Sequence, residues 1–201
     1  MAYYHDNREE IRRQLEAGET FAKQLQGNKP SLIEKILNWR AKIVMKKLRV
    51  YIDTSVIGGC LDDEFSLESN QLMEAIKQEK FILLMSDIIV SELINASQAV
   101  KDILLSIPQR VIEVVKITPE VLQLRDAYIN EWVVTSKSIN DATDVAAATI
   151  ARADAIISWN FKHIVRLDKM KGYNQINLLN GYGILTIISP LEVTIDQAND
   201  N

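Results

Sequence analysis

Three acidic residues, far apart in the sequence, have the types and surroundings of metal ligands. Asp53 directly follows an apolar stretch at 48–52, and Glu92 lies in a segment that begins at Ser86. Asp144 precedes a run of small residues, which lets a helix pack close to a sheet and would leave the acid partly buried. A buried carboxylate needs a cation, so these acids are candidates for a shared metal site.

Oxygen ligands without His or Cys select hard cations such as Mg²⁺ or Mn²⁺. Such ions polarise a phosphodiester, lower the pKa of a bound water and stabilise the leaving oxygen. The two histidines, His5 and His163, are far apart, which argues against a zinc site and against a ribonuclease that uses a His pair. The sequence contains no glycine-rich phosphate loop, no dinucleotide fingerprint and no Ser/His/Asp or Cys/His arrangement.

Each of these polar residues also has an ordinary structural explanation. Asp53 could cap the element that follows the strand, and Glu92 could simply be solvated. Asp141 and Asp144 share a face on a first helical turn, where acids complement the helix dipole. Asn160 could offer its carbonyl oxygen to a metal, or it could stabilise a turn.

Short apolar stretches alternate with segments of helical character along most of the chain. The predicted strands are 48–53, 81–85, 111–117, 155–159 and 184–188. The predicted helices are 67–79, 86–96, 98–107, 118–136, 140–153 and 161–180, with a loop or short helix at 54–66. This alternation indicates an α/β fold with a parallel sheet covered on both faces. Ligands of such sheets lie at the carboxyl ends of the strands, which is where Asp53 and Asn160 stand.

Helix start and stop signals refine these boundaries. Ser86 and Thr118 are predicted N-caps, and Thr118 is followed by Pro119 at the first helical position. Gly172 predicts a break within the segment 161–180, and Pro190 is expected to end the last strand.

The bulk composition is that of an ordinary globular protein. Apolar residues make up 47% of the 201 residues, enough for a sizeable core. The one cysteine, Cys60, cannot form an internal disulfide, which fits a reducing compartment. No apolar run approaches the roughly 20 residues of a membrane helix, and the polar N-terminus is not a secretory signal. We therefore expect a cytoplasmic protein without membrane association.

The net charge of −4 is unevenly distributed. Residues 1–44 carry eight Lys or Arg and six Asp or Glu, a balance of +2, whereas residues 45–201 carry fifteen and twenty-one, a balance of −6. Residues 32–44 have the pattern of an amphipathic helix whose apolar face needs a partner. We expect a helical N-terminal extension at 1–44 and a separate domain at 45–201.

The acidic balance also constrains any nucleic-acid function. A protein that binds nucleic acid through phosphates alone is expected to be basic. If this chain acts on RNA, metal ions must offset part of the repulsion, and binding without metal should be weak.

Five motifs, in this order and spacing, resemble the PIN-domain family. They are KLRVYIDTSVIGG, SDIIVSELINA, DATDVAAATIA, AIISWNFKHIV and INLLNGYGILTIISPLEV. Within that family the chain is similar to the VapC-like toxin ribonucleases of type II toxin–antitoxin systems, over about residues 45–195. The resemblance implies a three-layer α/β/α PIN-like domain with a parallel, roughly five-stranded sheet and a pocket of acids that binds Mg²⁺, with Mn²⁺ as a substitute.

The resemblance also implies roles for individual residues. It makes Asp53, Glu92 and Asp144 the catalytic acids and metal ligands. Asn160, the fourth predicted metal ligand, stands where the family often has a fourth acid, so one metal position is weakened. We expect one well-held ion and a second that depends on substrate phosphate. The ancillary positions, which orient ligands or water or support the acids, are matched by Thr54, Ser158 and Asp141.

These assignments imply an endoribonuclease that hydrolyses RNA phosphodiesters, forms a homodimer and is inhibited by a cognate antitoxin. A non-catalytic PIN module that binds protein or RNA is the alternative, and the uncharged Asn160 supports it slightly. A metal-dependent phosphatase acting on small molecules would need a second Asp two residues after Asp53, where the chain has Ser55.

The basic N-terminal segment generates a testable prediction. Type II antitoxins usually insert a helix, and often an Arg, into the acidic pocket, and Arg40 or Lys42 could do so in cis or in a neighbouring subunit. The segment could equally extend the core or a dimer, or form a helix-turn-helix that contacts DNA. Under the inhibitory hypothesis, deletion of residues 1–44 raises nuclease activity in an RNA cleavage assay; unchanged activity would contradict it.

Overall fold

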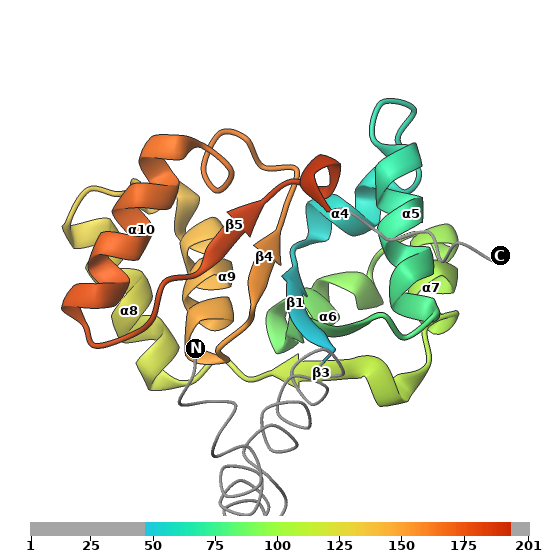
Figure 1. The fold of residues 1–201 in the computed structure, drawn as a ribbon, viewed down its shortest axis with the longest axis horizontal. Helices are drawn as coiled ribbons and strands as arrows, with labels where there is room; N and C mark the ends of the chain where they lie inside the picture. Colours follow the sequence, from blue (N-terminus) through green and yellow to red (C-terminus); the bar gives the residue numbers. More distant parts are fainter. Residues whose placement is uncertain (1–46, 194–201) are drawn as a thin grey trace, which may run out of the picture. The chain divides into compact units, whose positions relative to one another are not determined.

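The computed structural model describes residues 47–193, which form an α/β domain (Figure 1). The chain divides into two units, and the described residues belong to the second, Lys47–Asn201. The predicted extension at 1–44, with Arg40 and Lys42, lies outside the described residues. The inhibitory role predicted for that segment therefore stays a prediction.

The five strands form one parallel sheet in the order β3-β2-β1-β4-β5. They are β1 (Leu48–Ile52), β2 (Phe81–Ser86), β3 (Ile112–Val115), β4 (Ala155–Ile157) and β5 (Thr186–Ile188). The predicted parallel five-stranded sheet is confirmed. The structure shortens four predicted strands, those at 48–53, 111–117, 155–159 and 184–188. A 3₁₀ turn at Gln109–Val111 precedes β3.

Helices cover both faces of this sheet, so the expected three-layer α/β/α architecture is confirmed (Figure 1). They are α4 (Thr54–Gly59), α5 (Ser66–Lys77), α6 (Asp87–Ile94), α7 (Gln98–Leu105), α8 (Pro119–Asn130), α9 (Ile139–Ile150) and α10 (Leu167–Leu179). Within residues 47–193, none of these helices has the length and apolar character needed to cross a bilayer.

The central strand β1 determines where a ligand can bind. Val50, Tyr51 and Ile52 are buried, as expected for a parallel strand with helices on both faces. From β1 the chain builds outward through β2 to β3, and it then returns to β4 on the other side of β1. The strand order therefore reverses between β1 and β4. In open parallel sheets such a reversal leaves a crevice at the carboxyl ends of the strands.

Local capping fixes the starts of α6 and α8, the helices that follow β2 and β3. The Ser86 hydroxyl accepts a hydrogen bond from the Ile89 amide at 3.2 Å, and it caps α6. The Thr118 hydroxyl caps α8 in the same way, with Pro119 as the first helical residue. Both predicted N-caps are confirmed.

Helix α8 ends at Asn130 rather than continuing to residue 136, so that predicted boundary is wrong. The Trp132 backbone has a φ of 59°, and its amide donates to the Ile129 carbonyl. The Val133 amide then donates to the Tyr128 carbonyl. These two bonds close the helix end in a Schellman-type arrangement, with a tryptophan where a glycine is usual.

The break predicted at Gly172 is also wrong, because α10 runs through this residue. A Cβ atom at position 172 would lie 2.9 Å from Cγ1 of Val133. Glycine is therefore present for close packing against the segment that follows α8, not to interrupt the helix. Residues 161–166, which were predicted as helix, form turns instead.

A second close approach supports the loop that follows β4. The Trp159 indole donates to the Ser69 hydroxyl at 2.8 Å, and both groups lie against Gly59. A Cβ atom at Gly59 would lie 2.6 Å from the Ser69 oxygen and 2.9 Å from the indole nitrogen. Gly58, its neighbour in α4, has open space around the equivalent point.

These two glycines give a matched pair of stability predictions. Gly59→Ala should lower the free energy of unfolding by about 1–3 kcal/mol, because the added methyl separates the indole from Ser69. Gly58→Ala should be neutral or stabilise by about 0.5–1 kcal/mol, because alanine has a lower entropy cost than glycine in a helix. Urea unfolding of both variants tests this, and equal effects would contradict the close-packing argument.

Candidate functional site

Four carboxylates line a small cavity at the carboxyl edge of the sheet. Asp53 follows β1, Glu92 lies on α6, and Asp141 and Asp144 lie near the start of α9. The cavity has a volume of about 190 Å³, and its other lining residues are Thr54, Ile88, Ile89, Asn140 and Thr143. This wall contains no Lys or Arg of the described chain. The structure thus brings together all three predicted catalytic acids and the ancillary Asp141.

Asp53 is held by hydroxyl groups rather than by cations. Its side chain is 6% exposed and makes no capping hydrogen bond to α4, so capping does not explain the residue. The Ser55 hydroxyl donates to Oδ1 at 2.5 Å, and the Ser158 hydroxyl donates to Oδ2 at 2.8 Å. Burial raises the pKa of Asp53, and these two hydrogen bonds oppose the rise.

Ser55 is a residue of the site that the sequence did not reveal. Besides donating to Asp53, its oxygen accepts a hydrogen bond from the Trp159 amide at 2.9 Å. It therefore connects the end of β1 to the end of β4 across the crevice. The only available signal was a hydroxyl two residues after a strand-terminal Asp, a spacing typical of local side-chain hydrogen bonds.

Asp144 is held against the central strand β1. The Tyr51 hydroxyl donates to its Oδ1 at 2.7 Å, and Tyr51 is fully buried in β1. Burial, together with the negative charges of Asp53, Asp141 and Glu92, raises the pKa of Asp144 to about 7, against the lowering effect of the tyrosine hydrogen bond. The four acids are therefore close enough to repel one another.

Asn160 does not line the cavity but holds Asp141, which does. Its amide nitrogen donates to Asp141 at 2.9 Å, and its carbonyl oxygen accepts from the His163 amide at 2.9 Å. Burial raises the pKa of Asp141, while His163 and the hydrogen bonds of Ser138 and Asn160 lower it. Since the carbonyl oxygen of Asn160 is already engaged, this residue orients Asp141 in the structure.

Glu92 and Thr54 complete the wall of the cavity without being fixed in it. Both side chains are exposed, and neither hydrogen-bonds another residue within 47–193. Glu92 is therefore free to rotate toward a ligand, in contrast to Asp53 and Asp144.

The donor set fits a hard cation in its chemistry, because carboxylate oxygens from three elements face one space that lacks a compensating positive side chain. Within residues 47–193, however, no three His, Cys, Asp or Glu side chains already stand in a ligating arrangement. Binding of a cation would require Glu92 to turn inward, while Asp53 and Asp144 remain held by their hydroxyl donors.

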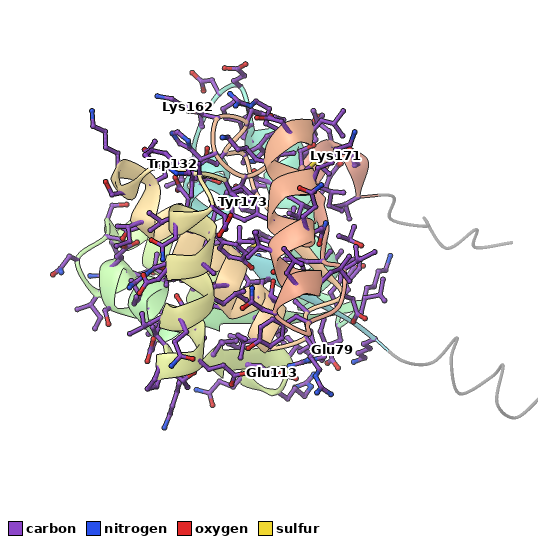
Figure 2. The ribbon with its side chains drawn as sticks, turned by 90° about the vertical axis from the view of Figure 1, so that its left-hand side faces the viewer. Glu79, Glu113, Trp132, Lys162, Lys171 and Tyr173 are labelled. Atoms are coloured by element: carbon purple, nitrogen blue, oxygen red, sulfur yellow. The ribbon has the colours of Figure 1, made fainter. Side chains whose placement is uncertain are left out.

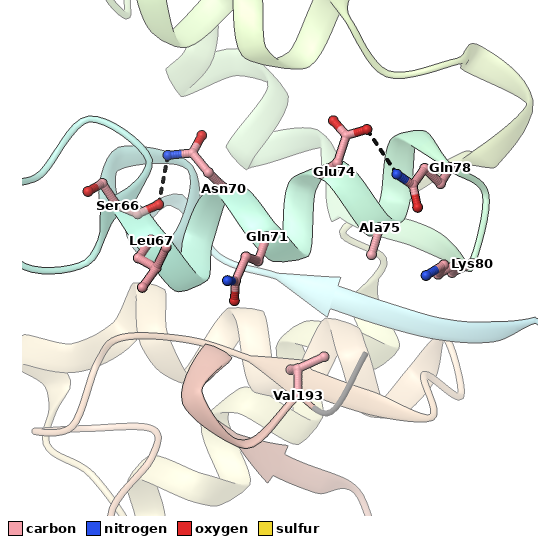
Figure 3. Close-up of a pocket in the computed structure, with 9 residues that line it drawn as sticks. All are labelled: Ser66, Leu67, Asn70, Gln71, Glu74, Ala75, Gln78, Lys80 and Val193. Carbon is pink, nitrogen blue, oxygen red and sulfur yellow. Dashed lines mark hydrogen bonds between the residues drawn. The ribbon is translucent and has the colours of Figure 1, made fainter. Parts of the chain in front are cut away.

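A larger cavity of about 660 Å³ lies along α5, but it lacks this chemistry (Figure 3). Its one acid, Glu74, accepts a hydrogen bond from Gln78, and the Asn70 amide donates to the Ser66 carbonyl. Amides and methylenes form most of its wall. The small acidic cavity is therefore the better candidate for a reaction.

Comparisons with known proteins do not assign this site to a family. No family model matches the chain, and no curated protein matches it in sequence. The assignment of function therefore rests on the geometry of the cavity and on the resemblance of the motifs.

The raised pKa of Asp144 predicts how stability depends on pH. The unfolded chain releases this proton near pH 3.8, whereas the folded chain holds it to about pH 7. Between these values the unfolded state binds fewer protons, so the free energy of unfolding falls as pH rises. In metal-free buffer, the melting temperature should therefore decrease from pH 5 to pH 8.

Asp144→Asn should flatten that dependence and raise the melting temperature at pH 8. Asp63→Asn, which removes an exposed acid outside the cavity, should retain the slope of the unmodified chain. Thermal melts of the three proteins decide the matter, and an unchanged slope in Asp144→Asn would remove Asp144 as the cause.

Proposed function

We propose that this chain is a Mg²⁺-dependent endoribonuclease with a PIN-like domain, in which Mn²⁺ can replace Mg²⁺. The observation that carries the proposal is the convergence of Asp53, Glu92, Asp141 and Asp144 on one cavity at the switch point of the sheet. Buried carboxylates are costly unless a cation compensates them, and the described wall supplies none. A divalent ion would compensate the charge of these carboxylates and could also activate a water for hydrolysis.

The size of the cavity favours a polymer as the substrate. A volume of about 190 Å³ is below the roughly 300–1,000 Å³ of typical small-molecule pockets. Such a cavity admits a phosphodiester group while the rest of the strand stays outside. This supports a nuclease over the phosphatase considered from the sequence.

The chain's own residues have distinct roles in this proposal. Asp53, Glu92 and Asp144 hold the cation, which when bound supplies an activated water and charge stabilisation at the leaving oxygen. Ser55 and Ser158 orient the two oxygens of Asp53. Tyr51 fixes Oδ1 of Asp144 and leaves Oδ2 without a donor among the described residues.

Asn160, Asp141 and Thr54 have secondary roles in this proposal. Asn160 orients Asp141, which adds negative charge to the wall. Thr54 lines the cavity with a free hydroxyl and is placed to position water or a phosphate oxygen.

A non-catalytic module that binds protein or RNA is the second candidate. Asn160 favours it, because an amide replaces the fourth acid of the family and its oxygen already accepts a hydrogen bond. Titration with Mn²⁺ separates the two candidates: a nuclease binds the ion in the acidic cavity and cleaves RNA, whereas a binding module needs no metal.

The biological setting is proposed on the resemblance alone. It makes the chain a cytoplasmic toxin of a type II toxin–antitoxin system, active as a homodimer and controlled by a cognate antitoxin. Control by its own N-terminal segment, through Arg40 or Lys42, is the alternative within this proposal.

Asp53→Asn tests the proposed reaction directly. The amide keeps the size of the side chain and removes the charge, so RNA cleavage in Mg²⁺ should fall by about 100-fold or more. The melting temperature should not fall, because one of four mutually repelling acids is removed. Asp102→Asn, an exposed acid on α7, serves as the control and should cleave normally. Full activity of Asp53→Asn would refute the proposal.

A further inference from the structure

Trp132 combines two features that are costly for the fold. Its side chain is 84% exposed, and its backbone lies in the left-handed region at a φ of 59°. A glycine would close α8 at this point without strain, and a bulky side chain is an outlier there. Strain of this kind is enriched at functional sites.

The fold itself does not use the Trp132 side chain. Glu79 has the same backbone conformation after α5, but its carboxylate pairs with Lys47 and Arg110. The Trp132 indole has neither a hydrogen bond nor a ring partner within residues 47–193. It stands at the rim of an open groove of about 750 Å³ between the end of α8 and α10.

Three exposed lysines lie on α10 and on the segments that follow α8 and β4. Lys137, Lys162 and Lys171 are exposed and form no ion pair with the described residues. In Figure 2, Trp132, Lys162 and Lys171 lie in the upper part of the molecule, whereas Glu79 and Glu113 lie at the opposite end. This end therefore carries free positive charge.

Nearby charges reduce this positive charge only in part. Arg166 and Asp168 pair with each other, and Lys169 donates to the Val133 carbonyl beside Trp132 at 2.6 Å. Glu131 is the remaining acid next to the indole. On the other side of the carboxyl edge, the loop between α4 and α5 holds exposed acids at 62–64. The positive charge available to a polyanion thus lies on Lys137, Lys162 and Lys171.

Two of the lysines, Lys137 and Lys162, are close along the chain to residues of the acidic cavity or to residues that support it. Lys137 lies in the 3₁₀ turn Ser136–Ser138, which leads directly into α9 and its cavity residues Asn140 and Asp141. Lys162 follows Asn160 by two residues, and Asn160 holds Asp141 by a hydrogen bond.

We propose that Trp132, Lys137 and Lys162 form a nucleic-acid-binding surface that holds unpaired nucleotides beside the acidic cavity. An exposed indole stacks on a base only when that base is unpaired, and the lysines neutralise the adjoining phosphates. That the bound strand is the substrate rests on the endoribonuclease proposed above; the surface itself does not. Apolar residues of the groove, such as Leu179, would also suit a protein partner, but the free lysines favour a polyanion.

Fluorescence anisotropy of a labelled oligouridylate, bound to the full-length chain in EDTA, tests this surface. Trp132→Gly should weaken binding about 5- to 100-fold, the fold-change that corresponds to one base stacked on an aromatic ring. Its melting temperature should be equal or higher, because glycine relieves the left-handed backbone. Loss of affinity without loss of stability is not expected from a merely structural residue.

Salt dependence tests the lysines separately. Lys137→Gln with Lys162→Gln should reduce the slope of log affinity against log salt by about 0.7 for each lysine. Lys116→Gln is the matched control, since Lys116 is an exposed lysine that follows the edge strand β3, and it should change nothing.

The outcomes separate this surface from the proposed reaction. Binding that depends on Trp132 without cleavage in any metal would retain the surface and overturn the nuclease. Cleavage with binding unaffected in Trp132→Gly would overturn the surface and retain the nuclease. Loss of concentration-dependent self-association in Trp132→Gly, with oligouridylate binding unchanged, would identify a protein contact instead and overturn the surface.

Discussion

Mutual repulsion among buried carboxylates is the constraint around which this domain is organised. Asp53 and Asp144 lie in a region where burial disfavours their charge, and Asp141 and Glu92 add like charge to the same cavity. Left to itself, such a cluster would spread apart or take up protons. It is maintained because β1 is fixed in register between β2 and β4, and because the small residues of α9 pack tightly against the sheet.

Acidic side chains have different partners at the two ends of the sheet. At the amino end, Glu113 pairs with Arg49, and Glu79 pairs with Arg110 and Lys47. At the carboxyl end, the side-chain donors to Asp53 and Asp144 within residues 47–193 are neutral hydroxyls. A hydroxyl fixes the direction of a carboxylate without cancelling its charge. The cavity therefore keeps the negative potential that a divalent ion needs, which lysines in the same places would have removed.

The sequence predicted the sheet, the number and order of the main helices and the acids that meet in the cavity, because strand ends and helix starts carry strong local signals. The roles of Tyr51 and Ser55 were not predicted from the sequence. A tyrosine within an apolar strand has the pattern of an ordinary core residue. The contacts of both residues also join segments that are far apart in the chain. Gly172 was misjudged because its reason is a neighbour, Val133, that no local pattern reveals. The role of Asn160 similarly depends on two partners in different elements.

For the RNA binding proposed above, the separation of charge over the surface answers the difficulty that the net charge of −4 creates. A cavity able to hold a cation must be negative, and a surface able to attract RNA must be positive. One site cannot satisfy both requirements. The domain places them in adjoining segments, with the acids inside the crevice and Trp132, Lys137 and Lys162 on the loops beside it. In this proposal, attraction of the strand and compensation of the carboxylates are distinct steps. The proposal therefore revises the expectation, drawn from the net charge alone, that binding without metal is weak.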